Sequence, residues 1–323
     1  MKQYSINKYL PKASKIAYGC MGLGGGWNEN PVTTENINQA RSIIETALES
    51  GINVFDHADI YTFNKAETAF GEALKQDPSL REKMYIQSKC GIRFEDDSAP
   101  GRYDFSADWV NKSVDGILQR LQIEKLDVLL LHRPDPLMNT EELAEALLKL
   151  RNSGKFEHLG VSNMNHHQIN FLQSSLNLTV VANQVEMSLA NLDWLNEGVM
   201  VGTPDENNNN YVAGMMEFCR LNDIQLQAWG SLARGVFSEK GINSEHQHIR
   251  ETSQYVMQLC EKYEVPSEVI VLMFLLRHPA NIQPIIGTTN LDRIRASTTA
   301  TENSLSREEW YHLFVKARNS KLP

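Results

Sequence analysis

The chain has 323 residues, of which 41% are hydrophobic and 22% are charged, a composition typical of soluble globular proteins and sufficient for one barrel or two smaller domains. Its formal net charge of −9, with no concentrated run of Lys and Arg, argues against nucleic acid as the main partner. No run approaches the roughly 18 apolar residues that cross a membrane, and residues 1–11 lack the apolar core of a signal peptide. We therefore expect a cytoplasmic protein that binds neither nucleic acid nor a membrane.

The four cysteines are widely spaced and include no C-x-x-C pair. Such spacing predicts neither a zinc site nor a disulfide scaffold. It fits a reducing compartment, in agreement with a cytoplasmic location. We therefore predict no bound metal.

Eight short apolar runs predict β-strands at residues 14–20, 52–58, 84–89, 126–132, 158–162, 179–186, 224–229 and 282–286. Stretches with helical periodicity follow them at 34–50, 65–75, 107–121, 141–152, 166–176, 211–221, 267–277 and 291–300. An eightfold alternation without an internal linker favours a closed (β/α)₈ TIM barrel over a doubly wound sheet. We predict an α/β protein in which residues 1–323 form a single domain.

Four segments stand outside the eight repeats. Residues 10–14, with those before them, are expected to form an N-terminal hairpin that closes the barrel floor. Residues 246–263 and 306–320 are expected to be extra helices. The asparagine-rich stretch 191–210 is interpreted as a mobile surface insertion.

Three successive predicted strands end in reactive polar side chains. The second leads into Asp56 and Tyr61, the third into Lys89, and the fourth into His132. Because functional groups of a parallel barrel gather at the carboxyl ends of its strands, we expect these four side chains to meet at one face.

These side chains suit acid catalysis at a carbonyl. A tyrosine is a useful general acid near neutral pH only if a neighbouring cation lowers its pKa, which is roughly 10 when free, and Lys89 is the candidate cation. Asp56 would compensate the charge of a buried Lys89. A neutral His132 would donate a hydrogen bond to the substrate carbonyl. The group predicts protonation of a carbonyl oxygen while its carbon is attacked.

The motifs at these strand ends resemble those of the aldo-keto reductases, and the resemblance covers nearly the whole chain. The segment 55–61 is similar to the family's Asp and Tyr motif, 87–89 to its Lys motif, and 130–135 to its His motif. The resemblance implies reversible hydride transfer between NADPH and a small-molecule aldehyde or ketone. It assigns Tyr61 as the acid, with the other three side chains tuning it and positioning the carbonyl.

The resemblance also implies a cofactor site. The nicotinamide carboxamide would be held by Ser162, Asn163 and Gln184, and Trp229 would stack on its ring where the family more often has tyrosine. Residues that resemble the loop covering the pyrophosphate are Ser231, Leu232, Arg234 and Gly235. The segment Gly287, Thr288 and Thr289 leads into a helix bearing Arg293, which suits the additional phosphate of NADPH. Ser297 stands where the family often has Asn, and Asp292 adds a negative charge beside Arg293.

Other residues near the predicted site have simpler interpretations. His57 alternates with Asp56 along the strand, so we expect it to face the helix layer. Trp27 either lines the substrate pocket or only packs on its neighbours. Specificity is expected in the loops 22–31, 93–105, 133–139 and 191–210, which contain no readable substrate signal. A self-closed barrel needs no partner, so a monomer is expected.

Two other functions remain open at this point. A metal-dependent hydrolase would use Asp56, His57, Asp59 and His132 as ligands, but it leaves Tyr61 and Lys89 without a role. A cofactor-binding regulatory subunit would keep the NADPH site and act as a redox sensor without turnover.

Overall fold

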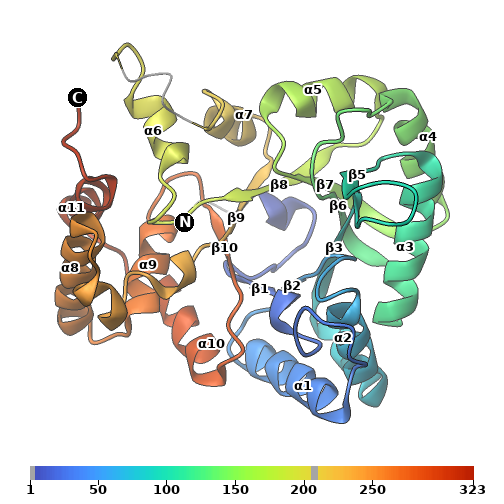
Figure 1. Cartoon of the computed structure of the whole chain (residues 1–323), viewed down its shortest axis with the longest axis horizontal. Helices are drawn as coiled ribbons and strands as arrows, with labels where there is room; N and C mark the ends of the chain where they lie inside the picture. Colours follow the sequence, from blue (N-terminus) through green and yellow to red (C-terminus); the bar gives the residue numbers. More distant parts are fainter. Residues whose placement is uncertain (1–3, 205–209) are drawn as a thin grey trace.

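The computed structural model describes residues 4–204 and 210–323. Eight parallel strands close into a barrel in the order β1, β10, β9, β8, β7, β6, β3, β2 (Figure 1). Their bounds are β1 (Ala17–Gly19), β2 (Val54–Asp56), β3 (Tyr85–Cys90), β6 (Leu126–Leu131), β7 (Phe156–Ser162), β8 (Val180–Glu186), β9 (Gln225–Trp229) and β10 (Gln283–Ile286). The predicted (β/α)₈ fold is therefore confirmed.

Helices surround the barrel and bury their apolar faces against the strands. They are α1 (Thr34–Glu49), α2 (Lys65–Gln76), α3 (Ala107–Leu121), α4 (Thr140–Asn152), α5 (His166–Ser175), α7 (Met215–Leu221), α9 (Ser267–Leu276) and α10 (Leu291–Thr298). Local signals set several boundaries: α1 begins with a capping box between Thr33 and Asn36. The bounds of α3 coincide with the sequence prediction. Helix α7 begins four residues later than predicted, because Gly214 adopts a left-handed φ of 82° just before it.

The N-terminal hairpin prediction is wrong for the described residues. Residues 4–14 contain the 3₁₀ helix η1 (Ser5–Lys8) and no strand. The backbone N–H of Ile6 donates to the side chain of Gln225 at 3.3 Å, so it needs no strand partner. Ile6 is buried in the same hydrophobic cluster as Val128 and Val181. The floor is closed by this 3₁₀ turn.

The stretch 191–210, expected to be a mobile surface insertion, is not a simple loop over residues 191–204, and its mobility stays a prediction. Residues 191–204 include the helix α6 (Asp193–Val199), whose Trp194 is buried. The indole packs edge-on against Phe274 of α9 and against His278. Residues 205–209 lie outside the described part of the chain.

The two extra helices are present as α8 (Gln247–Tyr263) and α11 (Arg307–Arg318). They lie beside α9 on one side of the barrel (Figure 1). Trp310 of α11 stacks on Phe274 at a ring distance of 4.9 Å. The loop 93–105 also contains part of an unpredicted hairpin of β4 (Ile92–Arg93) and β5 (Arg102–Tyr103).

Short 3₁₀ turns complete the chain at η2 (Cys20–Gly22), η3 (Pro78–Lys83), η4 (Ala233–Gly235), η5 (Glu239–Asn243) and η6 (Thr299–Thr301). Within the described ranges, no helix has the length and apolar character needed to cross a bilayer.

Candidate active site

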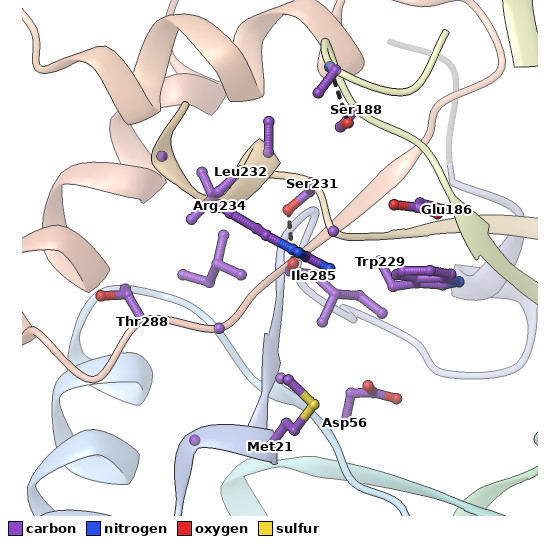
Figure 2. Close-up of a pocket in the computed structure, with 18 of the residues that line it drawn as sticks. Met21, Asp56, Glu186, Ser188, Trp229, Ser231, Leu232, Arg234, Ile285 and Thr288 are labelled. Carbon is purple, nitrogen blue, oxygen red and sulfur yellow. Dashed lines mark hydrogen bonds between the residues drawn. The ribbon is translucent and has the colours of Figure 1, made fainter. Parts of the chain in front are cut away.

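A pocket of about 910 Å³ opens at the carboxyl ends of the barrel strands (Figure 2). Its lining comes from the carboxyl ends of the barrel strands, from the segments that follow them and from α9. This volume is large enough for a dinucleotide-sized ligand.

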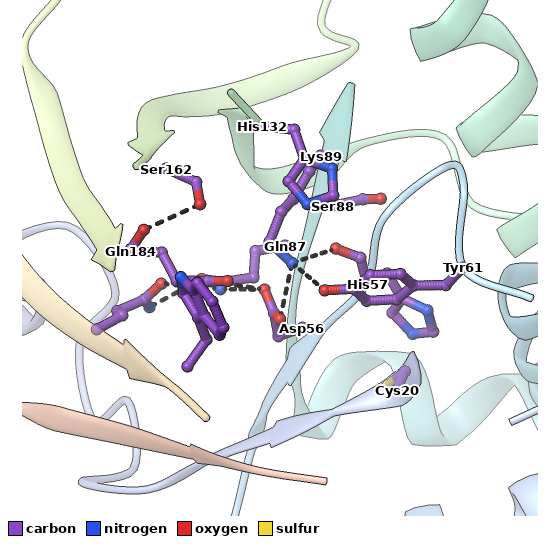
Figure 3. Close-up of polar contacts among 12 residues, drawn as sticks. Cys20, Asp56, His57, Tyr61, Gln87, Ser88, Lys89, His132, Ser162 and Gln184 are labelled. Carbon is purple, nitrogen blue, oxygen red and sulfur yellow. Dashed lines mark hydrogen bonds and ion pairs between the residues drawn. The ribbon is translucent and has the colours of Figure 1, made fainter. Parts of the chain in front are cut away.

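Lys89 lies beneath the pocket and is wholly buried. Its ammonium nitrogen donates to Asp56 Oδ2 at 2.8 Å, to the main-chain carbonyl of His57 at 2.8 Å and to the phenolic oxygen of Tyr61 at 2.9 Å (Figure 3). Three acceptors match the three hydrogens of an ammonium group. The lysine is therefore held in one position between Asp56 and Tyr61.

Strand register brings these groups together. Asp56 is paired with Gln87 of β3, and Lys89 lies two residues further along the same face of that strand. Tyr61 follows β2 in a turn in which Thr62, Phe63 and Asn64 all have positive φ. This tight left-handed turn leads directly into α2 and places the tyrosine over Lys89.

The charges in this cluster are strongly coupled. Burial alone would lower the pKa of Lys89, but the attraction of Asp56 and Tyr61 outweighs it and the pKa is raised, so the ammonium stays protonated. For Tyr61, burial raises the pKa above its ordinary value despite the lowering effect of Lys89. Lys89 therefore lowers the pKa of Tyr61, as expected, but burial outweighs this effect. Tyr61 holds its proton at neutral pH.

His132 lies at the end of β6 beside Tyr61, with a ring distance of 6.1 Å. Burial, assisted by the nearby charge of Lys89, lowers the pKa of His132 to about 2. The imidazole is therefore neutral. A neutral imidazole carries one N–H and is able to donate one hydrogen bond to a ligand in the pocket.

The three residues assigned to the carboxamide lie side by side at the ends of β7 and β8. Ser162 Oγ donates to the main-chain carbonyl of Gln184 at 2.9 Å, and Asn163 Nδ2 donates to Ser162 Oγ at 2.8 Å. Gln184 is also engaged below the pocket, because its Nε2 donates to Asp56 Oδ1 at 2.9 Å. All three line the pocket.

Two tryptophans stand at the pocket wall. Trp229 donates its indole N–H to Asn163 Oδ1 at 3.0 Å, which fixes the ring beside the carboxamide group of residues. Trp27 also lines the pocket, remains 48% exposed and packs edge-on against Phe63. Trp27 therefore lines the pocket as well as packing on a neighbour, and its contact with a substrate stays a prediction.

The far end of the pocket is rich in cations. Arg234 extends across it in Figure 2, and Lys240 and Arg293 also line it. Glu268 approaches Arg293 at 3.9 Å and is the acidic side chain at this end.

Most of the residues predicted to bind the phosphates of the cofactor line the pocket. The pocket lining includes Ser231, Leu232, Arg234, Gly235, Gly287, Thr288 and Arg293. Thr289 is exposed and outside that lining, and its role in cofactor binding stays a prediction. Ser297 is buried and donates to the carbonyl of Arg293, while Asp292 pairs with Arg295. Neither of the two departures from the family pattern neutralises Arg293.

The side chains considered as metal ligands do not converge. His57 is buried and faces Phe70 of α2 at a ring distance of 4.5 Å, as strand alternation predicts. Asp56 is already bonded to Lys89, and Asp59 is buried apart from the pocket lining. No group of three or more His, Cys, Asp or Glu side chains in the described residues is arranged to hold a metal ion. This geometry does not favour the hydrolase.

Sequence reasoning missed several residues at the site. Glu186 and Lys240 line the pocket, and Gln87 donates to Asp56 Oδ1 at 2.6 Å. One signal was present: Gln87 lies two residues before Lys89, and therefore on the same face of its strand. The partner of Gln87 across the barrel, Gln227, had no comparable signal.

The closed parallel barrel holds a buried lysine between a carboxylate and a tyrosine, beside a neutral histidine. A barrel protein with such a site is equipped to protonate a bound ligand. The chain belongs to the aldo/keto reductase family, whose model matches residues 15–314. It is 35% identical to the oxidoreductase YdhF of Escherichia coli over the full length of both chains. It is 31% identical to a 6-dehydroglucose reductase of Agrobacterium fabrum, covering 98% of each.

A solved structure extends the likeness of the fold. An aldo/keto reductase from Klebsiella pneumoniae, in complex with NADP and acetate, superposes with a TM-score of 0.70 at 20% identity. The match covers 96% of this chain and 93% of that one. The Klebsiella structure therefore has the same barrel fold as this chain.

Proposed function

We propose that the protein is an NADPH-dependent reductase of small aldehydes and ketones, in which Tyr61 is the general acid. The observation that supports this most directly is the contact of Tyr61 with the buried ion pair of Lys89 and Asp56. The family match and the NADP present in the Klebsiella relative agree with it.

The pocket fits the proposed cofactor. Cations at its far end, Arg234, Lys240 and Arg293, suit the phosphates of a dinucleotide. Ser162, Asn163 and Trp229 would hold the nicotinamide near Tyr61. When bound, NADPH supplies the hydride that reduces the carbonyl carbon.

The chain's own residues handle the proton. Tyr61, protonated at neutral pH, donates its phenolic proton to the carbonyl oxygen as negative charge develops there. Lys89 stabilises the phenolate that remains, because its ammonium already contacts that oxygen. The neutral His132 donates an N–H to the same carbonyl oxygen and orients it. Asp56 keeps Lys89 in place.

The test is NADPH oxidation by the wild-type protein with a panel of carbonyl compounds, repeated with NADH. The panel contains a reactive aromatic aldehyde and, because of the Agrobacterium relative's name, 6-dehydroglucose. We expect turnover that is faster with NADPH. Cofactor binding without turnover across the panel would instead favour the redox-sensing regulatory subunit, and no binding would remove the cofactor assignment.

A further inference from the structure

The barrel interior below Asp56 is occupied by amides. Interiors of such barrels are usually filled with branched aliphatic side chains. Here four glutamines point inward and are at most 2% exposed: Gln87 of β3, Gln184 of β8, Gln227 of β9 and Gln283 of β10. Buried amides cost free energy unless their hydrogen bonds are made, so their partners need an explanation.

The amides bond to one another across the barrel. Gln87 and Gln227 lie on strands at opposite sides of the closed sheet and form a reciprocal pair, with N to O distances of 2.9 and 3.0 Å. Gln227 Nε2 also donates to Gln283 Oε1 at 2.8 Å. Gln184 Nε2 donates to Gln227 Oε1 at 3.3 Å. We name these four side chains the glutamine chain.

The glutamine chain has two fixed ends. At the barrel floor, Gln283 Nε2 donates to the main-chain carbonyl of Ser14 at 2.7 Å. At the pocket, Gln87 Nε2 and Gln184 Nε2 both donate to Asp56 Oδ1, at 2.6 and 2.9 Å. The glutamine chain therefore joins the floor of the barrel to the carboxylate that holds Lys89.

The carbonyl of Ser14 sets the direction of every amide. A carbonyl oxygen only accepts, so Gln283 must turn its NH₂ group toward Ser14 and its oxygen toward Gln227. Gln227 must then turn its NH₂ toward Gln283 and its oxygen toward the other two amides. As a result, NH₂ groups face Asp56.

Asp56 therefore meets hydrogen-bond donors at both oxygens. Oδ1 accepts from the two amides and Oδ2 accepts from Lys89. Only an ionised carboxylate accepts from all three, because a proton on Oδ1 would face two donors. The other titratable groups near it are Tyr61 and the buried thiol of Cys20, whose pKa burial raises.

We propose that Gln87, Gln227 and Gln283 are positioning residues, which fix the orientation and the ionised state of Asp56 and, through it, the contact of Lys89 with Tyr61. The catalytic part of this inference rests on the proposed reductase function. The structural part does not, because it concerns a carboxylate whose ionisation is measurable without turnover.

The protein contains another buried glutamine that serves as a matched control. Gln225 is also a buried glutamine of β9, but its side chain bonds to the backbone of Ile6, Leu226 and Asn281. Gln225→Met therefore removes buried amide bonds outside the glutamine chain. Gln227→Met removes the central link, and Gln283→Met removes the anchor to Ser14 without touching the pocket lining.

The first measurement is carbon-13 NMR of protein labelled at the aspartate side-chain carboxyls, with Asp56→Asn used to identify the Asp56 signal. We expect this signal to titrate at higher pH in Gln227→Met and Gln283→Met than in the wild type, and unchanged in Gln225→Met. Two separate variants, Gln227→Met and Gln283→Met, protect against the failure of either one to fold. The proposal would be overturned if the Asp56 signal titrated at the wild-type pH in both Gln227→Met and Gln283→Met. It would also be overturned if Gln225→Met shifted the titration of Asp56 by the same amount.

The second measurement is steady-state kinetics. Gln227→Met removes the amide that orients Gln87 and Gln184 toward Asp56. The loss of a buried hydrogen bond predicts a fall in kcat of about tenfold, with an unchanged KM for NADPH. Gln225→Met should keep the wild-type kcat. An unchanged kcat in Gln227→Met would overturn the contribution of the glutamine chain to catalysis. If the wild type itself reduces no carbonyl, the proposed function fails, and the NMR titration still decides whether the chain controls Asp56.

Discussion

The phenolic oxygen of Tyr61 lies 2.9 Å from the ammonium nitrogen of Lys89, which has no exposed surface. Lys89 in turn forms its ion pair with Asp56, which is 2% exposed. A phenol, an ammonium and a carboxylate in one buried row can be arranged stably only when each charge has its partner. This relation links the stability of the barrel to its proposed chemistry.

Lys89→Met should strongly destabilise the protein, because it leaves the Asp56 carboxylate buried without its counter-ion. We expect a loss of about 3–5 kcal/mol in the free energy of unfolding, measured by urea denaturation. The double variant Asp56→Asn/Lys89→Met removes both charges and should recover part of that loss. As a control, Lys8→Met breaks the exposed pair with Asp223 and should cost less than about 1 kcal/mol. Equal losses for the buried and the exposed pair would contradict this prediction.

Asp59 should make stability fall as pH rises. Burial, with the nearby charge of Glu67, raises the pKa of Asp59 to about 8 in the folded protein, from an ordinary value of about 3.9. Between these values the folded state binds more protons than the unfolded state, so its stability decreases with increasing pH. Asp59→Asn removes this titration. Compared with that variant, the wild type should lose free energy of unfolding from about pH 4 to about pH 8. Parallel stability curves for the two proteins would show that Asp59 is ionised throughout.

Arg293→Ala should weaken the binding of NADPH more than that of NADH, because NADPH carries one more phosphate. Loss of a charge-assisted hydrogen bond predicts a reduction in NADPH affinity of about 10- to 100-fold. Cofactor fluorescence titration measures both affinities. Arg295→Ala is the matched control, since Arg295 lies on the same helix and pairs with Asp292. If both cofactors lose affinity equally in Arg293→Ala, Arg293 does not contact the additional phosphate.

Gly71→Ala should disturb the packing of α2 on α3. A Cβ at Gly71 would lie 2.1 Å from the main-chain oxygen of Arg120, and backbone cannot move aside easily. Overpacking of this kind typically costs about 1–3 kcal/mol, more than the gain in helix propensity from replacing glycine. Gly198→Ala in α6 meets no atom within 4 Å and should be neutral or stabilising. Thermal unfolding of the two variants distinguishes these outcomes.

The sequence was sufficient to predict the barrel and the residues that meet at its mouth. Asp56, Lys89 and His132 follow directly from the rule that functional groups gather at strand ends, because each stands at or beside the end of an apolar run. The strand period also predicted that His57 faces the helices. These are local patterns, which a single segment contains in full.

Properties that depend on closure of the barrel could not be predicted in this way. The pKa of Tyr61 rises because of its depth of burial, which no segment encodes. The bond between Gln87 and Gln227 joins residues 140 positions apart, on opposite strands. The prediction of an N-terminal hairpin was wrong for the same reason. The side chain of Gln225, distant in the sequence, accepts the hydrogen bond of the Ile6 backbone N–H.

The most direct test of the central claim is single-turnover oxidation of bound NADPH by a reactive aldehyde, comparing the wild type with Tyr61→Phe. This substitution removes the phenolic proton and keeps the ring. We predict that the rate falls by at least about 100-fold, while the affinity for NADPH, measured in the same samples, stays unchanged. A Tyr61→Phe rate close to that of the wild type would show that the proton comes from another group.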